Sequence, residues 1–272
     1  MGHDMRRKWL SQSGISLSYL DSETPGPLVL LLHGLAGQAS EWAATIDSLA
    51  GSYRVVALDQ RGHGQSDKRL SEYSRESFVA DASGLVESLG DGPAIVVGQS
   101  MGGVNALVLA AVRPELVVAL VVVEASVSPD PDIVSQIARW LDSWPTPFAT
   151  RDQAVGFFGG NTLYARTWAE VLEETPSGYF PQFMREDMLA SVADMAHTDR
   201  WEQWLSIRCP TLVVAGGAGL SSRDEMKRMS DAQSRARYVE VPGAGHDVHL
   251  EKPVEWQEIL ESYLAEVVSG RA

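Results

Sequence analysis

Short runs of almost uninterrupted apolar residues recur along this 272-residue chain, and they restrict its fold more than any other feature of the sequence. A strand that buries one face alternates apolar and polar residues, whereas an uninterrupted apolar run is typical of a parallel strand buried on both faces. Helix-like segments separate the runs, and this alternation predicts a right-handed, doubly wound sheet. The apolar runs are residues 28–32, 53–59, 94–98, 116–124, 211–216 and 236–241.

Three further segments have recognisable local signatures. Residues 76–90 repeat apolar side chains at helical spacing on one face. Residues 101–115 are rich in small side chains, and Pro114 ends the helix that they predict. Near the N-terminus, residues 8–21 predict a hairpin at the edge of the sheet.

The strand pattern breaks between residues 128 and 207, where only helices are evident. We therefore expect residues 1–127 and 208–272 to form one α/β core, interrupted by a helical cap over residues 128–207. Five of the eight tryptophans fall in this insertion, which predicts an aromatic core for the cap, a lid over an apolar pocket, or both. The residues that we expect to line such a pocket are Trp140, Trp144, Phe157 and Trp168.

The charge and cysteine content exclude several classes of protein. The chain has 22 basic and 36 acidic residues, and the resulting net charge of −14 opposes binding to nucleic acid or to an anionic membrane surface. No apolar run approaches the roughly 20 residues of a membrane span, and no apolar segment typical of a secretion signal follows the basic N-terminus. Cys209 is the only cysteine, so no disulfide can form within the chain. We expect a cytoplasmic protein in which Cys209 is a small buried apolar residue.

The pentapeptide GQSMG at residues 98–102 predicts a nucleophilic serine. It follows an apolar strand and precedes a helix, the context in which G-x-S-x-G places a serine on a strained turn. Glycines flank Ser100 because side chains there would collide with the neighbouring strand and helix. The helix N-terminus also favours an anionic intermediate beside Ser100.

Together with three other segments, this motif resembles the α/β-hydrolase superfamily over nearly the whole chain. The segments are LLLHGLAG at 30–37, VVALDQRGHGQSD at 55–67 and VPGAGHDVHLEKP at 241–253. The resemblance implies an α/β-hydrolase fold with an inserted cap. It also implies that the backbone N–H groups of Leu35 and Met101 form the oxyanion hole.

The resemblance separates this chain from some members of the superfamily. Haloalkane dehalogenases and epoxide hydrolases of this fold attack with an aspartate, and Ser100 cannot replace that carboxylate. The turn HGLAGQ also departs from the pattern of carbon–carbon bond hydrolases. We interpret Asp59, Arg61 and His63 as scaffolding of a structural loop.

Among the histidines, His246 is the candidate general base. It lies in GAGHDVHLEKP, on a loop after the last apolar strand, where the family places its catalytic histidine. His249 is expected to shape the pocket or to cap the last helix. His33 belongs to the oxyanion turn, and His3 and His197 are expected at the surface.

The acid of the triad is not where the family usually carries it. That position falls on Gly219, within a stretch without a carboxylate. Glu124 ends the strand expected to pair beside that of Ser100, and some relatives carry their acid there. Asp224, at a helix start, is a second candidate, and a chain without an acid is the third. Losing the orienting charge can lower the rate by about 10⁴, so a relocated acid is favoured over a lost one, and Glu124 is the favoured position.

The motifs predict a serine hydrolase that acts on an ester or thioester with an apolar or aromatic group. An acyltransferase is an alternative if the cap excludes water, with an acyl group carried on a carrier protein or coenzyme A. A non-catalytic ligand-binding homologue is a further alternative, because the usual acid is missing at Gly219. No metal or dinucleotide signature is present, so we expect no cofactor. The basic residues that could bind an acidic acyl carrier are Arg185, Arg223, Lys227 and Arg228.

Overall fold

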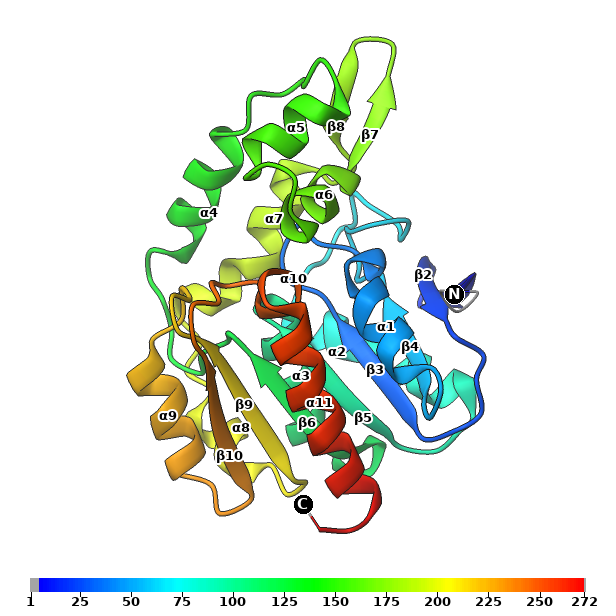
Figure 1. Ribbon diagram of the computed structural model, residues 1–272, viewed down its shortest axis with the longest axis vertical. Helices are drawn as coiled ribbons and strands as arrows, with labels where there is room; N and C mark the ends of the chain where they lie inside the picture. Colours follow the sequence, from blue (N-terminus) through cyan, green and yellow to red (C-terminus); the bar gives the residue numbers. More distant parts are fainter. Residues whose placement is uncertain (1–4, 272) are drawn as a thin grey trace.

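The computed structural model describes residues 5–271 and has an eight-stranded sheet at its centre, with helices on both faces (Figure 1). The strand order is β1-β2-β4-β3-β5-β6-β9-β10, and every pair from β4 to β10 is parallel. This arrangement confirms the predicted α/β-hydrolase fold. The strands are β1 (Arg6–Gln12), β2 (Ile15–Asp21), β3 (Leu28–Leu32), β4 (Arg54–Leu58), β5 (Ala94–Gln99), β6 (Val117–Val123), β9 (Thr211–Gly216) and β10 (Ala236–Val241).

Both faces of the sheet are buried, which explains why the strand sequences are continuously apolar. Leu30 and Val96 point to the face covered by α2, α3, α8 and α9, while Leu31 and Val97 point to the face covered by α1 and α11. Successive side chains of a strand point to opposite faces, so each residue needs an apolar side chain. The helical elements around the sheet are η1 (Ala39–Trp42), α1 (Ala43–Leu49), α2 (Arg75–Leu89), α3 (Met101–Val112), η2 (Pro114–Leu116), α8 (Trp201–Ser206), α9 (Arg223–Asp231), α10 (Val248–Glu251) and α11 (Pro253–Val268).

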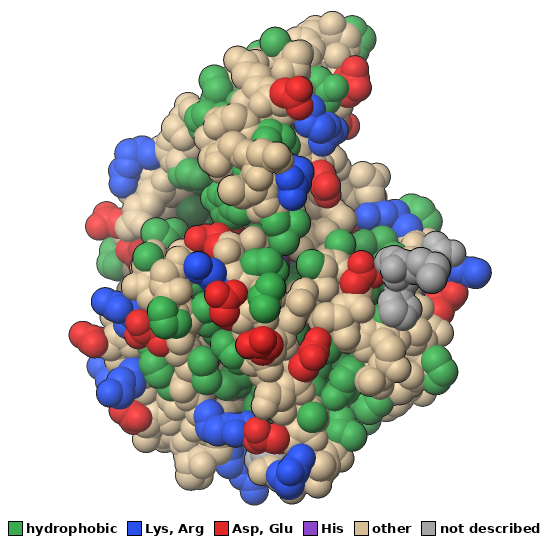
Figure 2. All heavy atoms as spheres, in the orientation of Figure 1, with side chains coloured by type: hydrophobic (Ala, Val, Ile, Leu, Met, Phe, Trp, Pro, Cys, Tyr) green, Lys and Arg blue, Asp and Glu red, His purple; other side chains and the backbone are tan. Residues whose placement is uncertain are grey.

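The predicted edge hairpin is present: β1 and β2 pair antiparallel, and β2 pairs antiparallel with β4. The helix expected over residues 101–115 ends at Val112, because Pro114 starts the separate 3-10 turn η2. On the face seen in Figure 2, acidic and basic side chains are interspersed.

The segment between β6 and β9 contains a cap that lies beyond the C-terminal ends of the parallel strands (Figure 1). Aromatic side chains, Trp144 and Phe148 among them, form its core, which also packs against Leu35 and Met101 of the sheet domain. The cap therefore closes over the edge of the sheet where Ser100 lies. Its elements are α4 (Ile133–Asp142), α5 (Arg151–Phe157), α6 (Leu163–Glu170), β7 (Leu172–Thr175), β8 (Gly178–Pro181), α7 (Arg185–Val192) and η3 (Ala193–Ala196).

The expectation that the insertion contains only helices is wrong. Strands β7 and β8 form a two-stranded antiparallel hairpin, and Phe148 adds a bridge to Tyr179. Each strand has four residues, and β7 carries two glutamates, so neither shows an apolar pattern that indicates a strand. The long-range contact with Phe148 is not visible in the local sequence.

Helix α8 lies inside the segment predicted to be the cap but packs on the sheet. Trp204 is fully buried in the cluster that includes α3 and α9, and its Nε1–H donates to the Met229 carbonyl oxygen at 2.8 Å. Cys209 is partly buried against the same cluster, and burial raises the pKa of its thiol to about 11. Among residues 5–271, no helix is long and apolar enough to cross a membrane.

Candidate active site

Ser100 occupies a tight turn between β5 and α3. Its backbone has φ 53° and ψ −120°, a conformation that is uncommon and strained for a residue with a side chain. The Ser100 N–H donates to the Val123 carbonyl oxygen of the neighbouring strand β6 at 2.9 Å, which fixes the turn against the sheet. The strand–turn–helix context predicted from GQSMG is therefore present.

The glycines around Ser100 are required by close backbone approaches. A Cβ atom on Gly98 would overlap the carbonyl oxygen of Gly102. A Cβ atom on Gly102 would overlap the carbonyl oxygens of Leu32 and His33 at the end of β3. Helix α3 can thus begin directly beside β3 and β5 only because these positions lack side chains.

The turn that follows β3 lies against the serine. A Cβ atom built on Gly34 would be 3.4 Å from the Ser100 Cβ, and the Gly37 N–H closes the turn on the Gly34 carbonyl oxygen at 3.2 Å. Leu35, the predicted first oxyanion donor, lines the same pocket as Ser100. Met101, the predicted second donor, is the first residue of α3.

The structure brings His246 and Glu124 together. The His246 Nδ1 lies 3.2 Å from the Glu124 Oε2, and the Glu124 side chain is completely buried. Glu124 directly follows β6 and has a left-handed φ of 50°, which turns its carboxylate toward the end of β9. The carboxylate accepts hydrogen bonds from the N–H groups of Gly216 at 2.8 Å, Leu220 at 3.0 Å and Ser221 at 3.1 Å.

The glycine at the family's usual acid position is explained by this arrangement. A Cβ atom on Gly219 would overlap the carboxylate of Glu124, so the two positions cannot both carry an acid. Asp224 lies in the first turn of α9, is exposed, and has no hydrogen bond to His246 among the described contacts. Of the two carboxylates considered from the sequence, only Glu124 reaches the imidazole.

The surroundings of His246 shift its protonation. Burial lowers the pKa of the imidazole, but the hydrogen bond to Glu124 and the negative charges of Asp247 and Glu251 outweigh burial, so the pKa is raised above its usual 6.5. The nitrogen that faces Glu124 is Nδ1, so the carboxylate does not engage the other ring nitrogen, Nε2.

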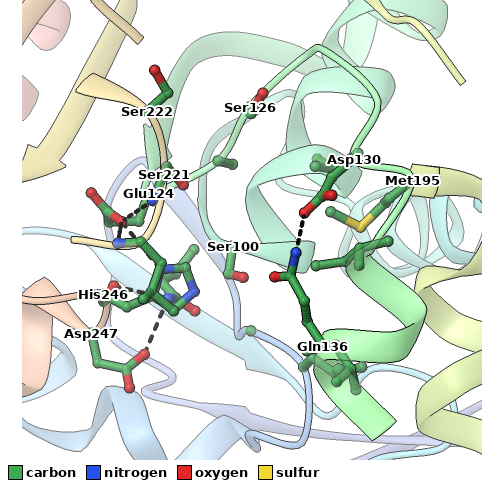
Figure 3. A pocket seen from close by; sticks show the side chains of 18 of the residues that line it. Ser100, Glu124, Ser126, Asp130, Gln136, Met195, Ser221, Ser222, His246 and Asp247 are labelled. Carbon is green, nitrogen blue, oxygen red and sulfur yellow. Dashed lines mark hydrogen bonds and ion pairs between the residues drawn. The ribbon is translucent and has the colours of Figure 1, made fainter. Parts of the chain in front are cut away.

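A pocket of about 520 Å³ lies between the sheet and the cap. Ser100 lies between His246 and Glu124 on one side and Asp130 and Gln136 on the other (Figure 3). The apolar side chains that line the pocket are Leu35, Val104, Ala125, Val127, Pro129, Ile133, Ile137, Trp140, Trp168, Met195 and Leu220.

Two of the four predicted aromatic residues are not in this pocket. Trp140 and Trp168 line it, but Trp144 and Phe157 do not. Trp144 is 5% exposed and packs edge-on against Trp140 and Trp168 within the core of the cap. Phe157 is 44% exposed and contacts Phe148. Helical spacing gave the apolar side chains of the cap but not which of them face the pocket.

Sequence reasoning missed several polar residues at the pocket. Asp247 is buried and accepts hydrogen bonds from the Gln99 Nε2 at 3.1 Å and the Trp168 Nε1 at 3.1 Å. Tyr164 and Glu41 also line the pocket. The one available signal was that Asp247 follows His246 and Gln99 precedes Ser100, since neighbours of site residues often support them.

The loop of Asp59, Arg61 and His63 has the scaffolding role expected from the sequence. All three side chains are buried and lie outside the pocket lining. The Asp59 carboxylate accepts from the N–H groups of Ala39 at 2.7 Å and Gln65 at 3.1 Å. Arg61 forms two hydrogen bonds to Asp81, of 2.7 and 2.8 Å. These contacts hold the loop against η1 and α2.

The remaining histidines have different outcomes. His33 is buried in the oxyanion turn and its Nε2 accepts from the Gln60 N–H at 3.0 Å, whereas His197 is exposed as expected. His249 neither lines the pocket nor caps α11, because it is buried in α10 and stacks on Trp42 at 4.0 Å. His3 lies outside the described residues. No cluster of metal-ligating side chains occurs between residues 5 and 271.

Comparison with known proteins assigns this chain to a family. Residues 27–253 match the model of the alpha/beta hydrolase fold family. The chain therefore belongs to the α/β-hydrolase family, and its general class is that of a hydrolase.

Individual relatives are more distant. The chain is 28% identical to the 2-(acetamidomethylene)succinate hydrolase of Mesorhizobium japonicum, over 84% of each chain. It is 29% identical to the sn-1-specific diacylglycerol lipase ABHD11 of Mus musculus, over 92% of this chain and 85% of that protein. A crystal structure of E-2-(acetamidomethylene)succinate hydrolase matches with a TM-score of 0.89 and 23% identity, over 96% of this chain and all of the other, and this match supports the fold.

The overlap at Gly219 generates a test of stability. We predict that Gly219→Ala lowers the free energy of unfolding by about 2–4 kcal/mol, because the new methyl group displaces the Glu124 carboxylate from its backbone donors. Urea denaturation would measure this change. Gly51→Ala is the matched control, since open space surrounds that position, and we expect a change within about 0.5 kcal/mol. Equal effects at both positions would contradict the explanation.

Proposed function

We propose that this protein is a serine hydrolase that cleaves an ester or thioester through an acyl-enzyme on Ser100, with His246 as general base and Glu124 as the acid that orients it. The observation that carries the proposal is the hydrogen bond between His246 and the buried Glu124, in the pocket that Ser100 lines. The order serine, acid, histidine along the chain is also that of the family.

In the proposed reaction, the Ser100 Oγ attacks the substrate carbonyl carbon while His246 accepts the hydroxyl proton. The carbonyl π electrons move to oxygen, and the oxyanion is stabilised by the N–H groups of Leu35 and Met101. Collapse of the tetrahedral intermediate breaks the bond to the leaving alkoxide or thiolate, which takes the proton from His246. Water then repeats the sequence on the acyl-enzyme and releases the acid.

Glu124 supports this chemistry by its burial and its donors. The three backbone N–H groups donate to its carboxylate oxygens, and the side chain is fully shielded from solvent. The fixed carboxylate holds the Nδ1 proton of His246, so that the free lone pair is on Nε2. It also stabilises the imidazolium that forms as Ser100 attacks.

The pocket favours a substrate group that is apolar and without negative charge. Trp140 and Trp168 provide aromatic surface, and Arg200 is the only lysine or arginine among the described lining residues. Arg200 is already bound to Asp194. An anionic substrate would therefore meet several carboxylic residues without a free lysine or arginine among the described lining residues. The carboxylic residues of the lining are Glu41, Glu124, Asp130, Glu225 and Asp247.

This inference distinguishes the chain from one of its relatives. The printed substrate of the Mesorhizobium japonicum protein is a succinate derivative, whereas we propose a neutral ester for this chain. The name of the mouse relative, a diacylglycerol lipase, is consistent with a neutral ester substrate. At 28% and 29% identity, neither name fixes the substrate here.

The acyltransferase alternative differs only in the acceptor that attacks the acyl-enzyme. Two of the residues considered for an acidic acyl carrier are paired with carboxylates, Arg185 with Asp142 and Arg223 with Glu240. Arg228 stacks over the Trp201 ring at 4.4 Å. The two ion pairs reduce the positive charge offered to a carrier, so hydrolysis is the proposal that we favour.

The first prediction of this proposal concerns the nucleophile. We expect a fluorophosphonate to form a covalent adduct on Ser100, because the elbow exposes its hydroxyl beside a base and an oxyanion hole. Mass spectrometry of peptides would locate the adduct, and Ser100→Ala should abolish it. A folded wild-type protein without an adduct would favour the non-catalytic alternative.

The second prediction concerns the acid. Glu124→Gln should lower kcat by about 10³–10⁴, because the imidazole loses the negative charge that fixes its tautomer and stabilises the imidazolium. The acidic limb of the pH–rate profile should also move. This limb reports the protonation of His246, which inactivates the base, and in the wild type it lies above pH 6.5 because the pKa of His246 is raised. In the variant the limb moves to lower pH, because the hydrogen bond to the Glu124 carboxylate no longer raises that pKa.

Asp224→Asn is the matched control for this prediction, because it removes the other carboxylate considered from the sequence and is exposed. We expect its activity to match that of the wild type. Circular dichroism would check that Glu124→Gln is folded, since Glu124 also binds three backbone amides. A folded Glu124→Gln protein with near-normal activity would overturn the assignment.

The third prediction concerns substrate charge. We expect kcat/KM for para-nitrophenyl butyrate to exceed that for the similarly sized, anionic para-nitrophenyl hydrogen succinate by about tenfold or more. Asp130→Asn should narrow this difference, because it removes one carboxylate from the lining. A preference for the anionic ester would contradict the proposed substrate class while leaving the proposed reaction intact.

A further inference from the structure

A second buried carboxyl group lies at the candidate active site and takes no part in the proposed triad. Glu41 belongs to η1, is 8% exposed, and lines the same pocket as Ser100. Its Oε2 accepts a hydrogen bond from the Gln38 N–H at 3.2 Å. A carboxyl group so deeply buried needs a structural or chemical reason.

The oxyanion turn is built between Glu41 and the nucleophile. On one side, Gly37 lacks a Cβ atom where the Glu41 Oε2 lies, since a methyl group there would overlap that oxygen. On the other side, Gly34 approaches Ser100, with 3.4 Å between its Cβ position and the Ser100 Cβ. The hydrogen bond from the Gly37 N–H to the Gly34 carbonyl oxygen joins the two sides. The position of the Glu41 carboxyl group therefore helps to set the position of the Leu35 N–H.

Among the described contacts, Glu41 forms no ion pair with a lysine or arginine. The basic side chain that it contacts is His249, whose Nε2 lies 3.2 Å from the Glu41 Oε1. His249 is stacked on Trp42, and among the described residues neither of its ring nitrogens has a partner with hydrogen-bond geometry. Burial lowers the pKa of His249 to about 4, so its imidazole is neutral at neutral pH.

The groups around Glu41 favour its protonated form. Burial raises the pKa of its carboxyl group to about 7, and the negative charge of Asp59 acts in the same direction. The electrostatic interaction with His33 and the N–H groups of Gln38 and Gly34 oppose this rise only in part. Asp247, which precedes α10, adds a further carboxyl group that interacts electrostatically with Glu41.

We propose that Glu41 is a positioning residue of the oxyanion hole and that it supports turnover in its protonated form. The proposal rests on the proposed function, because it assumes that negative charge develops at the Leu35 and Met101 amides. A neutral carboxyl group holds the turn without opposing that charge. An ionised carboxylate behind the same turn would repel the oxyanion and would weaken its stabilisation.

The proposal gives the pH–rate profile two limbs with different origins. Activity requires neutral His246, whose raised pKa places the acidic limb above pH 6.5. Activity also requires protonated Glu41, so the rate falls as pH rises through about 7. The result is a narrow bell in which each limb belongs to one residue.

The test compares the wild type with Glu41→Gln between about pH 5.5 and pH 9.5, following hydrolysis of para-nitrophenyl butyrate and inactivation by a fluorophosphonate. For the wild type, we expect the rate at the alkaline end to fall about tenfold below its maximum. In Glu41→Gln, which keeps an acceptor for the Gln38 N–H, this rate should stay within about twofold of the maximum. The acidic limb should be unchanged. Asp224→Asn, which removes an exposed carboxylate outside the pocket lining, is the matched control and should keep the alkaline limb.

Thermal unfolding provides a readout that does not depend on activity. The pKa of the Glu41 carboxyl group is 4.5 in the unfolded chain and about 7 in the folded protein. Between these values the unfolded chain loses its proton more readily than the folded protein, so the wild type loses stability as pH rises from about 4.5 to 7. Glu41→Gln lacks this loss. We therefore expect its Tm relative to that of the wild type to increase by several degrees over this range.

The outcomes separate this inference from the function on which it rests. An alkaline limb that survives in Glu41→Gln overturns the inference and leaves the hydrolase proposal intact. A uniform loss of rate at every pH, with the bell unchanged, also overturns it, because that result indicates packing alone. A wild type that reacts at no pH contradicts both. Loss of the alkaline limb only in Glu41→Gln supports the proposed role.

Discussion

The candidate active site depends on one buried carboxylate. Glu124 has a left-handed backbone conformation at the end of β6 and binds backbone amides in the loop after β9, while its Oε2 contacts His246. One side chain thus joins the ends of two neighbouring strands and the loop that carries the histidine. Residue 219 is a glycine because the Glu124 carboxylate fills the space that its side chain would occupy. The carboxylate that contacts His246 therefore comes from the end of β6, while the position after β9 carries a glycine.

The sheet explains why such an exchange is possible. Strand β6 pairs in parallel with both β5, which leads to Ser100, and β9, which leads to Gly219. The carboxyl ends of parallel strands meet at one edge, about 4.8 Å apart from strand to strand. A loop histidine above that edge can be reached from either β6 or β9. The fold therefore fixes where the histidine loop lies and leaves open which of the two strands supplies the carboxylate that contacts it.

Glu124 and Glu41, two of the three buried carboxyl groups that line the pocket with Ser100, have opposite environments. Glu124 is surrounded by backbone N–H donors that stabilise a negative charge, whereas Glu41 has fewer donors, a neutral histidine and other carboxyl groups nearby. Such a pair can divide two tasks, since one carboxylate is aimed at the imidazole and the other carboxyl group lies behind the turn that follows β3.

The sequence by itself determined the strands of the parallel sheet, the serine elbow and the histidine loop, because apolar continuity and glycine spacing are local patterns with local physical causes. It also limited the acid to a few positions, through strand order alone. The tertiary structure decided what depends on contacts between distant residues: that Glu124 and not Asp224 reaches His246, and that Trp140 and Trp168 face the pocket while Trp144 and Phe157 do not. It also decided the hairpin of β7 and β8 and the burial of Glu41 behind the oxyanion turn. These features depend on how helices and strands pack against one another. A periodic pattern of apolar residues indicates which face of a helix or strand is buried, but it does not indicate which residues of another element lie opposite that face.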